Sequence, residues 1–312
     1  MFNHFRSCNN RSYIYFFLFK GTINTRNLGS MSMERHYNTH RARKNDIMLP
    51  VRKFHNFVKA RLIASVCQED TSRYLDFCCG NGGDIGKLVF HNIKEYFGID
   101  IANQAVERAA IRLKEQTQLT GDAISLNAFS LTCGNMLDRM RPFDIVSCQF
   151  ALHYAFSTEC MARTAIQNIS MAMIKGSYFI GTILDCEYLL NSRKLLGKKF
   201  GDRYHKVNFE NKEFNEKFGD AYEFSFTGAV DTLTEYVVHK SVLVNLCDEC
   251  GLELVAWRNF KDYYDNKDQA IDLWNRIGAT FVPVSQMYIT FCFRKYDDEE
   301  TFLTTPKVLG SN

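Results

Sequence analysis

Proline and long apolar stretches are scarce in this sequence. Its 312 residues include only 4 prolines and 18 glycines, which excludes a collagen-like or low-complexity chain. No apolar run reaches about 18 residues, so we expect no membrane-spanning helix. Charge of one sign is also lacking, because 38 basic residues against 35 acidic residues leave a net charge of +3. A chain with this balance does not coat nucleic acid by charge alone.

Cysteine is present, but not in a disulfide pattern. The 11 cysteines are an odd number, and neighbours such as Cys78 and Cys79 do not easily bridge each other. We therefore expect a reducing compartment, either the cytosol or the nucleus. Cys247 and Cys250 have the spacing of zinc ligands, but no second pair follows at zinc-ribbon distance. We interpret them as small buried thiols and predict no metal site.

Acidic residues are missing from the amino-terminal segment. Residues 1–33 contain no Asp or Glu, carry four Lys or Arg residues, and include a short aromatic stretch. A mitochondrial transit peptide, a disordered basic arm, and an extension before a start at Met31 or Met33 all fit this composition. We favour a disordered basic arm over residues 1–45, and we expect a short tail at 297–312.

Regular patterns begin at residue 46 and continue to residue 296, where the many aromatic residues can fill a large core. Apolar strands alternate with amphipathic helices at short spacing. Strands are predicted at residues 74–79, 96–100, 126–132, 143–148, 178–183, 252–257 and 287–293, and helices at 51–64, 84–90, 104–115, 158–174 and 237–250. The alternation predicts one α/β domain with a mostly parallel sheet and helices on both faces. Residues 185–235 break the rhythm and are predicted to form an insertion over the sheet edge.

A Gly-rich turn follows the first predicted strand, in the sequence Asp76-Phe-Cys-Cys-Gly-Asn-Gly-Gly-Asp84. Glycines let a ligand approach the backbone at the carboxyl end of a parallel strand, where open α/β sheets bind nucleotides. Asp100 ends the second predicted strand, and a carboxylate there can accept hydrogen bonds from both ribose hydroxyls. The dinucleotide pattern G-x-G-x-x-G is not matched. The turn and Asp100 together predict a site for a nucleoside-containing cofactor.

This turn, followed by an acid at the end of the second strand, resembles the S-adenosylmethionine (AdoMet) site of class I methyltransferases. Further segments, in the same order, resemble the eukaryotic mRNA cap guanine-N7 methyltransferases. The most specific is Ser147-Cys-Gln-Phe-Ala-Leu-His-Tyr154, and others lie at residues 54–59, 75–87, 98–102, 176–182, 222–231 and 288–293. The resemblance covers residues 34–296. It implies a Rossmann-like sheet of about seven strands, with the 185–235 insertion forming part of the cap pocket.

The resemblance also implies which residues form the two binding sites. The cofactor site would consist of Lys59, Cys78, Gly80, Asp100, Asn135, Gln149 and Tyr154. The cap site would consist of Asn56, Asn81, Lys87, Arg112, Phe150, His153, Glu235 and Tyr288. The chemistry agrees, because a triphosphate bridge suits Lys87 and Arg112 and the donors on guanine N1 and N2 suit the carboxylate of Glu235. A planar purine suits aromatic side chains such as Phe150 and Tyr288.

Four positions depart from the family pattern. Cys78 stands where the family has a glycine of the cofactor turn, and Asn81 stands where it has a lysine for the cap phosphates. Asn135 takes the place of an aspartate that accepts from the adenine amino group, and Leu184 the place of a proline at the cap pocket. We interpret the chain as a divergent member of the family.

The implied reaction is methyl transfer from AdoMet to N7 of the terminal guanosine of capped RNA (GpppN to m7GpppN), in the nucleus. Guanine N7 already carries a lone pair at neutral pH, so we name no catalytic acid or base. The implied partner is the capped 5′ end of mRNA, and relatives suggest an activating subunit or the RNA polymerase II capping machinery. Two alternatives stay open. One is a methyltransferase of another RNA or a small molecule, and the other is a catalytically weak protein that binds the cap or AdoMet.

Overall fold

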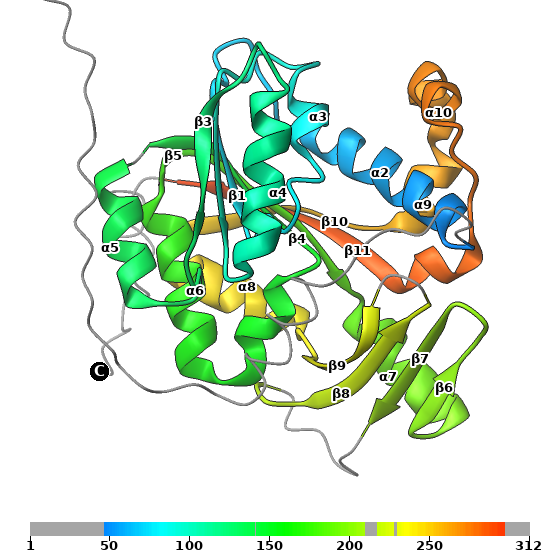
Figure 1. Cartoon of the computed structure of the whole chain (residues 1–312). Coiled ribbons are helices and arrows are strands. Elements are labelled where there is room, and N and C mark those ends of the chain that lie inside the picture. The colour runs from blue at the N-terminus through cyan, green and yellow to red at the C-terminus, as the bar shows by residue number, and fades with distance from the viewer. Residues whose placement is uncertain (1–46, 141, 210–216, 228–229, 297–312) are drawn as a thin grey trace, which may run out of the picture.

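The computed structural model describes residues 47–140, 142–209, 217–227 and 230–296, so the predictions for 1–45 and 297–312 lie outside the described residues. A seven-stranded sheet in the order β10-β11-β5-β4-β1-β2-β3 forms the centre (Figure 1). Neighbouring strands among β1 to β5 run parallel, and β11 is antiparallel to both β5 and β10. The predicted mostly parallel α/β sheet of about seven strands is confirmed.

The parallel strands are β1 (Arg73–Phe77), β2 (Glu95–Asp100), β3 (Thr120–Ser125), β4 (Phe143–Gln149) and β5 (Met173–Leu184). β10 (Leu252–Asn259) and β11 (Tyr288–Lys295) complete the sheet. Because all five parallel strands run in one direction, their carboxyl ends share one edge. The Gly-rich turn, Asp100 and Gln149 therefore meet at that edge.

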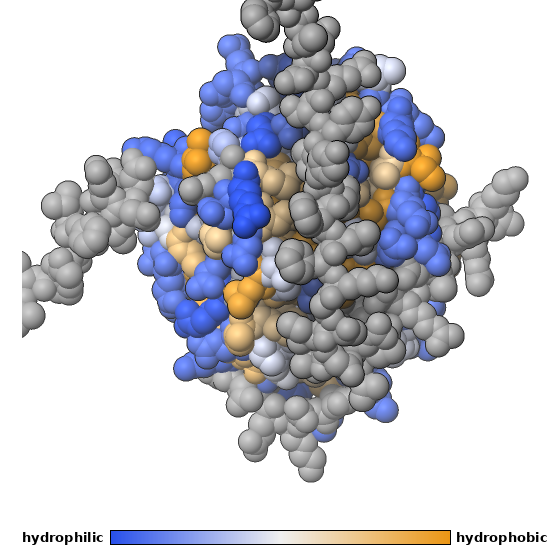
Figure 2. All heavy atoms as spheres, turned by 60° about the vertical axis from the view of Figure 1, so that its left-hand side comes forward, coloured by the Kyte–Doolittle hydropathy of each residue, from blue (hydrophilic) through white to orange (hydrophobic). Residues whose placement is uncertain are grey.

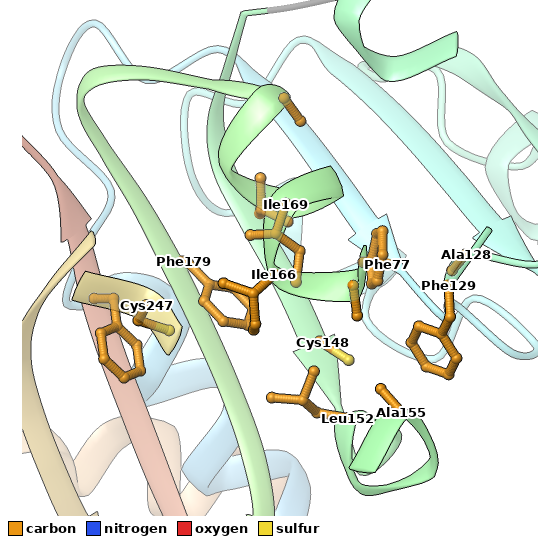
Figure 3. Close-up of a cluster of buried hydrophobic side chains, with 14 of the residues drawn as sticks. Phe77, Ala128, Phe129, Cys148, Leu152, Ala155, Ile166, Ile169, Phe179 and Cys247 are labelled. Carbon is orange, nitrogen blue, oxygen red and sulfur yellow. The ribbon is translucent and has the colours of Figure 1, made fainter. Parts of the chain in front are cut away.

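Helices cover both faces of the sheet. α2 (Leu49–Ala64), α3 (Ile85–Leu88) and α4 (Asn103–Lys114) pack on one face, and α5 (Leu131–Met140), α6 (Glu159–Met171) and α8 (Lys240–Glu249) pack on the other. Figure 3 shows Ile166 and Ile169 of α6 beside Phe179 of β5. Burial on both faces explains why the central strands are apolar almost throughout rather than alternating. The other short helical segments are η1 (Leu152–Ser157), α9 (Phe260–Asp265), η2 (Lys267–Ala270), α10 (Ile271–Ile277) and η3 (Pro283–Met287).

The third strand lies earlier in the chain than the sequence pattern predicted. β3 covers Thr120–Ser125, whereas residues 126–132 form a loop and the beginning of α5, so that prediction was wrong. β3 is the edge strand, and most of its side chains are exposed. An exposed edge strand does not need the apolar pattern of a buried one. The apolar residues that suggested a strand, Ala128 and Phe129, are instead buried from the loop against the core.

The segment predicted as an insertion forms α7 (Cys186–Leu196) and most of a second, antiparallel sheet in the order β6-β7-β8-β9. Its strands are β6 (Lys199–Gly201), β7 (His205–Phe209), β8 (Ala221–Phe226) and β9 (Val230–Tyr236). The buried side chains of Cys186, Asp220 and His239 connect this sheet to the helices α7 and α8. His239 Nε2 lies 3.2 Å from Asp220 Oδ2, and His239 Nδ1 lies 3.4 Å from Cys186 Sγ. This contact joins the start of α7 to the residues just before β8 and α8.

Within the described ranges, no helix combines the length and apolar character needed to cross a membrane. The cysteines of the same ranges, including Cys247 and Cys250, are all free thiols. No group of three or more His, Cys, Asp or Glu side chains in the described part of the chain is arranged to hold a metal ion. Figure 2 shows hydrophobic side chains in separate patches among hydrophilic ones, as is usual for a protein surface.

Candidate active site

The Gly-rich turn begins directly after β1 and adopts a backbone that favours glycine. Cys78, Gly80 and Gly82 have φ angles of 71°, 49° and 67°, all in the left-handed region. A Cβ atom on Gly82 would come within 3.0 Å of Ala109, so α4 packs directly against the turn. A Cβ atom on Gly80 would meet no atom within 4 Å. The turn is therefore closed on the side of α4 and has open space above Gly80.

Asp100 anchors this turn from the end of β2. Its Oδ2 accepts a hydrogen bond from Gly80 N at 2.8 Å, and its Oδ1 accepts one from Ala102 N at 2.9 Å. Burial raises the pKa of Asp100, and the backbone N–H groups of Ala102 and Gly80 partly oppose this rise. A carboxylate held at this edge keeps lone pairs for further donors, such as two ribose hydroxyls. The structure thus brings the predicted residues Gly80 and Asp100 together.

Lys59 and Lys87 share one carboxylate beside the turn. Asp84 Oδ1 lies 2.7 Å from Lys59 Nζ and 2.6 Å from Lys87 Nζ. Burial opposes ionisation of Asp84, but the two ammonium groups outweigh it and hold the pKa of Asp84 below its usual range. Lys87 Nζ also donates to Gly83 O at 2.9 Å. The lysine predicted for the cofactor and the lysine predicted for the cap are therefore neighbours.

Gln149 ends β4 and faces the same edge of the sheet. Its Nε2 donates to Ser147 Oγ at 2.9 Å, whereas its buried Oε1 has no hydrogen-bond partner within the described part of the chain. A buried acceptor without a partner costs free energy unless a ligand satisfies it. Gln149 therefore has the property expected of a ligand-binding side chain. Tyr154, another predicted cofactor residue, is buried nearby in η1.

Asn135 lies elsewhere. It is exposed in the middle of α5, not at the carboxyl end of a strand, so the structure does not place it with Asp100 and Gln149. The first polar side chain beyond β3 is Asn127, whose Oδ1 accepts from Phe129 N at 3.0 Å. Leu126 N donates to Asp100 O at 2.9 Å, which holds this loop beside Asp100. Correct placement of the third strand would have indicated Asn127, rather than Asn135, as the polar side chain beside Asp100.

A cavity of about 220 Å³ lies between α2, the second sheet and the ends of β5 and β11. Its lining is mainly apolar and aromatic, with a few polar groups, and comprises Met48, Val51, Arg52, His55, Phe150, His153, Ile183, Leu184, Phe224, Phe226, Val230, Glu235 and Tyr288. Four predicted cap residues are thus brought together from distant parts of the sequence, namely Phe150, His153, Glu235 and Tyr288. A cavity of this kind suits a flat ligand with a polar edge.

Its polar groups are buried and incompletely paired. His153 Nε2 lies 3.5 Å from Glu235 Oε1, and neither ring nitrogen of His153 makes a hydrogen bond in the described residues. Glu235 Oε2 accepts from the Tyr222 hydroxyl at 3.0 Å. Burial lowers the pKa of His153 to about 3 and raises that of Glu235 to about 8. A neutral imidazole and a carboxyl group with unused hydrogen-bonding capacity therefore face an apolar cavity.

Phe150 connects the two sites. It follows Gln149 directly and has a φ angle of 56°, and its N–H lies 3.0 Å from both Thr182 O and Thr182 Oγ1. Its ring centroid lies 5.4 Å from that of His55, 5.1 Å from that of Tyr288 and 5.9 Å from Lys59 Nζ. Gln149 therefore faces the sheet edge formed by the Gly-rich turn and Asp100, which we call the cofactor edge. Its neighbour Phe150 faces the cavity, which we call the aromatic cavity, and Lys59 lies between these regions.

Sequence reasoning missed Arg52 and His55 of the cavity wall. Both are on α2, where positions 52, 55, 56 and 59 share one helical face, so the spacing from Lys59 was a usable signal. His55 Nε2 lies 3.1 Å from Ser285 Oγ, and burial lowers the pKa of His55 to about 3. Asn56 is half-buried on the same helix.

The remaining predicted cap residues lie outside the cavity wall. Lys87 is on α3, Arg112 is exposed on α4, and Asn81 lies in the Gly-rich turn, where its Oδ1 accepts from Arg108 Nε at 2.6 Å. Lys87 and Asn81 therefore lie at the turn, whereas Arg112 is an exposed side chain of the helix that packs against it. The structure thus separates the predicted cap residues of the cavity from the polar residues Asn81, Lys87 and Arg112.

Comparison with known proteins assigns the chain to a family. Residues 23–295 match the mRNA (guanine-N(7))-methyltransferase domain. The mRNA cap guanine-N(7) methyltransferase of Candida glabrata is 31% identical over 300 residues, which cover 84% of this chain and 71% of that protein. This chain belongs to the mRNA cap guanine-N7 methyltransferase family. Its resemblance to the family, inferred from the sequence motifs, is confirmed.

Other members of the family are similar over comparable lengths. The Saccharomyces cerevisiae protein is 34% identical over 254 residues, covering 73% of this chain and 58% of that protein. The Arabidopsis thaliana mRNA cap guanine-N(7) methyltransferase 1 is 31% identical, covering 74% and 67%. The chain thus spans little more than half of the Saccharomyces cerevisiae relative.

Solved structures show the same fold at lower identity. The CcbJ methyltransferase from Streptomyces caelestis superposes with a TM-score of 0.53 at 12% identity, covering 78% of this chain and 90% of that one. An S-adenosylmethionine-dependent methyltransferase from Clostridium acetobutylicum gives a TM-score of 0.50 at 14% identity, covering 79% and 92%. These matches support the class I methyltransferase fold.

Proposed function

We propose that this chain methylates N7 of the terminal guanosine of capped RNA, with AdoMet as the methyl donor. The observation that carries the proposal is the pair Gln149 and Phe150. These consecutive residues face a cofactor edge and an aromatic cavity, so a nucleoside cofactor and a purine base can lie next to each other. Family membership supports the choice of AdoMet and a guanosine cap over other pairs of ligands.

The chain's residues fit AdoMet at the cofactor edge. Asp100 offers carboxylate oxygens for the ribose, and Gln149 Oε1 is a buried acceptor that needs a donor. Lys59 supplies an ammonium group for the carboxylate of the methionine part, in exchange for its contact with Asp84. Asn127, beyond β3, offers an amide at the edge next to Asp100, where an adenine would lie.

The aromatic cavity fits a guanine base. Guanine N1–H and N2–H₂ suit a carboxylate. Glu235 is protonated near neutral pH in the ligand-free chain, and these donors favour its charged form when the base binds, while His153 adds a neutral imidazole beside it. Phe150 and Tyr288 form apolar walls on which a purine can stack. Binding of the base would satisfy buried polar groups that lack partners in the described structure, which favours guanine over an apolar ligand of the same shape.

The residues act by orientation and electrostatics. Bound AdoMet supplies an electrophilic methyl group on its sulfonium. Glu235 and His153 hold the guanine edge and thereby fix the direction in which N7 points, while Phe150 and Tyr288 exclude water from around the base. As the base gains positive charge, the carboxyl of Glu235 stabilises it, because the cavity has a low dielectric. The chain itself moves no proton in this step.

The proposal also includes a cellular location and protein partners. We include a nuclear location, because the family takes its name from mRNA cap methylation. An activating subunit and the RNA polymerase II capping machinery are kept as proposed partners. The capped 5′ end of RNA is the substrate at the centre of the proposal.

Methyl transfer is the direct test. Purified protein would be incubated with labelled AdoMet and RNA ending in GpppG or GpppA, with m7GpppG-ended RNA as the control substrate. We expect label on the first two RNAs and none on the third. Label on all three would indicate a different target atom, and label on none, with AdoMet bound, would favour the cap-binding alternative.

Substitution of Glu235 tests whether the aromatic cavity binds the guanine base. Glu235→Gln keeps the size of the side chain but replaces one acceptor with a donor, so GpppG affinity should fall about tenfold while AdoMet affinity stays unchanged. Glu253→Gln, an exposed change on β10, is the matched control. Calorimetry with each ligand gives both values. Equal losses for GpppG and AdoMet would show that Glu235 is structural.

A further inference from the structure

Three buried polar side chains form a line of contacts at one end of the second sheet. His239 Nε2 lies 3.2 Å from Asp220 Oδ2, and His239 Nδ1 lies 3.4 Å from Cys186 Sγ. Each of the three residues is at most 8% exposed, and within the described ranges none of them lines the aromatic cavity. Buried polar groups are stable only where they are paired, so these contacts hold all three side chains in place. We call this set the His239 link.

One arrangement of protons satisfies both contacts of the His239 link. An ionised Asp220 carboxylate only accepts, so the proton of a neutral His239 ring is on Nε2, and Nδ1 accepts from the Cys186 thiol. Burial, together with the nearby carboxylates of Asp185 and Glu187, raises the pKa of the Cys186 thiol to about 12. The thiol therefore keeps the proton that it donates. A buried, protonated thiol is not a nucleophile, so the link is not a catalytic triad.

The link fixes the ends of the two strands that carry Glu235 and its partner. Asp220 lies two residues before Tyr222, and His239 lies four residues after Glu235. Asp220 O accepts from Val237 N at 2.9 Å, close to the pair Tyr222 and Glu235 in the register of β8 and β9. The Tyr222 hydroxyl donates to Glu235 Oε2 at 3.0 Å. The contacts of the link therefore help to set where the Glu235 carboxyl lies.

Cys186 connects the link to the part of the cavity wall that belongs to the large sheet. It is the first residue of α7 and lies two residues after Leu184, which ends β5. Asp185 N donates to Met287 O at 2.8 Å, so the start of α7 is also held beside Tyr288. Leu184 and Tyr288 both line the aromatic cavity. The link therefore joins the second sheet to the large sheet next to the cavity that lies between them.

We propose that His239 is a positioning residue for the guanine base, which sets the place of Glu235 relative to the wall formed by Leu184 and Tyr288. The apolar side chains around the link bury surface without a preferred direction, whereas hydrogen bonds have a narrow range of length and angle. This inference rests on the proposed function, since the base is the guanine that Glu235 would hold. His239 acts only through Glu235 and touches neither ligand.

Two substitutions of Cys186 test the proposal. Cys186→Ser keeps a donor for His239 Nδ1, whereas Cys186→Ala removes it. We expect GpppG to bind about threefold to tenfold more weakly to Cys186→Ala and close to normally to Cys186→Ser, with AdoMet affinity unchanged in both. Cys247→Ala, at a fully buried thiol of α8, is the matched control and should bind GpppG as the wild type does. Calorimetry with each ligand gives the values.

His239→Gln tests the same contact from its other side. The amide of Gln can still donate to Asp220 but does not reach Cys186. We therefore expect this variant to lose about as much GpppG affinity as Cys186→Ala. The two changes together should cost little more than either alone, since both break one contact.

A double-mutant cycle with Glu235→Gln separates positioning from general stability. In the Glu235→Gln background, Cys186→Ala should weaken GpppG binding by less than about twofold, because the carboxylate through which the link acts is already gone. A merely structural role would lower the Tm in both backgrounds and leave the two losses of GpppG affinity additive.

The outcomes are distinct. Wild-type GpppG affinity for Cys186→Ala would overturn the proposal, as would equal losses of GpppG and AdoMet affinity, no recovery with Cys186→Ser, or full additivity with Glu235→Gln. If the wild-type protein binds AdoMet but not GpppG, the proposed function itself fails. That result appears before any variant is compared, so the two failures can be told apart.

Discussion

The cofactor edge and the aromatic cavity are built in contrasting ways. The anchor of the cofactor edge is local, since the turn after β1 and Asp100 at the end of β2 come from one short part of the chain, and backbone N–H groups hold the carboxylate. The cavity instead takes side chains from α2, η1, β9 and β11, and both ring nitrogens of His153 lack a hydrogen-bond partner among the described residues. Backbone hydrogen bonds thus hold the turn and Asp100, whereas the cavity depends on side chains that several distant elements bring together. Mutations should therefore act differently on the two.

The largest effect is expected at the cofactor edge. Asp100→Ala removes the proposed acceptor for two ribose hydroxyls, and each such hydrogen bond is worth about 1.5–3 kcal/mol, so AdoMet affinity should fall at least tenfold. Asp122→Ala, an exposed change on β3, serves as the control. Calorimetric titration with AdoMet measures the loss. An unchanged affinity would remove Asp100 from the site.

A smaller effect is expected on the pH dependence of the free energy of unfolding, through Glu235 in the aromatic cavity. Burial raises the pKa of Glu235 from 4.5 to about 8, so the folded chain keeps a proton that the unfolded chain has released between these values. The stabilisation from the protonated carboxyl is complete below pH 4.5 and is lost as pH rises to about 8. Asp76, with a pKa raised to about 7, acts in the same direction.

We therefore expect the free energy of unfolding of the ligand-free protein to decrease from about pH 6.5 to pH 8, since below pH 6.5 the lowered pKa values of His55 and His153 act in the opposite direction. Glu235→Gln has no titrating group at this position, so its decrease should be smaller. Urea unfolding of both proteins at several pH values gives the two curves. Parallel curves would mean that Glu235 does not titrate in this range and that the cavity is more polar than its lining indicates.

The smallest effect is expected at the turn itself. Cys78 has a φ angle of 71°, which costs an L-residue with a side chain about 1–2 kcal/mol, whereas glycine costs less there but loses more entropy on folding. Cys78→Gly should therefore stabilise the protein by about 0.5 kcal/mol. Thermal unfolding of the variant and of Cys67→Gly, a change at a partly exposed cysteine, would show the difference. A lower Tm for Cys78→Gly would mean that packing of the thiol outweighs the backbone strain.

The difference between the regions also explains what could be predicted from the sequence. The turn and Asp100 were predictable because strand, turn and acid follow one another in a local pattern, and the structure joins Gly80 to Asp100 as expected. The third strand was misplaced because an exposed edge strand carries no apolar alternation. Because of the same error, Asn135 was predicted instead of Asn127, and only the structure shows that the loop with Asn127 lies beside Asp100.

The cavity could be predicted only through the family resemblance. Nothing in the local pattern around Glu235 or Tyr288 shows that they lie near His153, because their proximity depends on strand order in two sheets. His55 and Arg52 were missed for a different reason. Their helix was predicted correctly, but its polar face was not followed beyond Lys59.

The position of β11 has a consequence for how this protein is made. β11 is the last described strand in the chain, yet it lies between β5 and β10 and begins with Tyr288 of the cavity wall. During synthesis, β5 and β10 leave the ribosome before the strand that joins them, and their facing edges stay unpaired until it arrives. The growing chain therefore exposes two strand edges that other chains can pair with. The aromatic cavity is accordingly one of the last parts of the molecule to form.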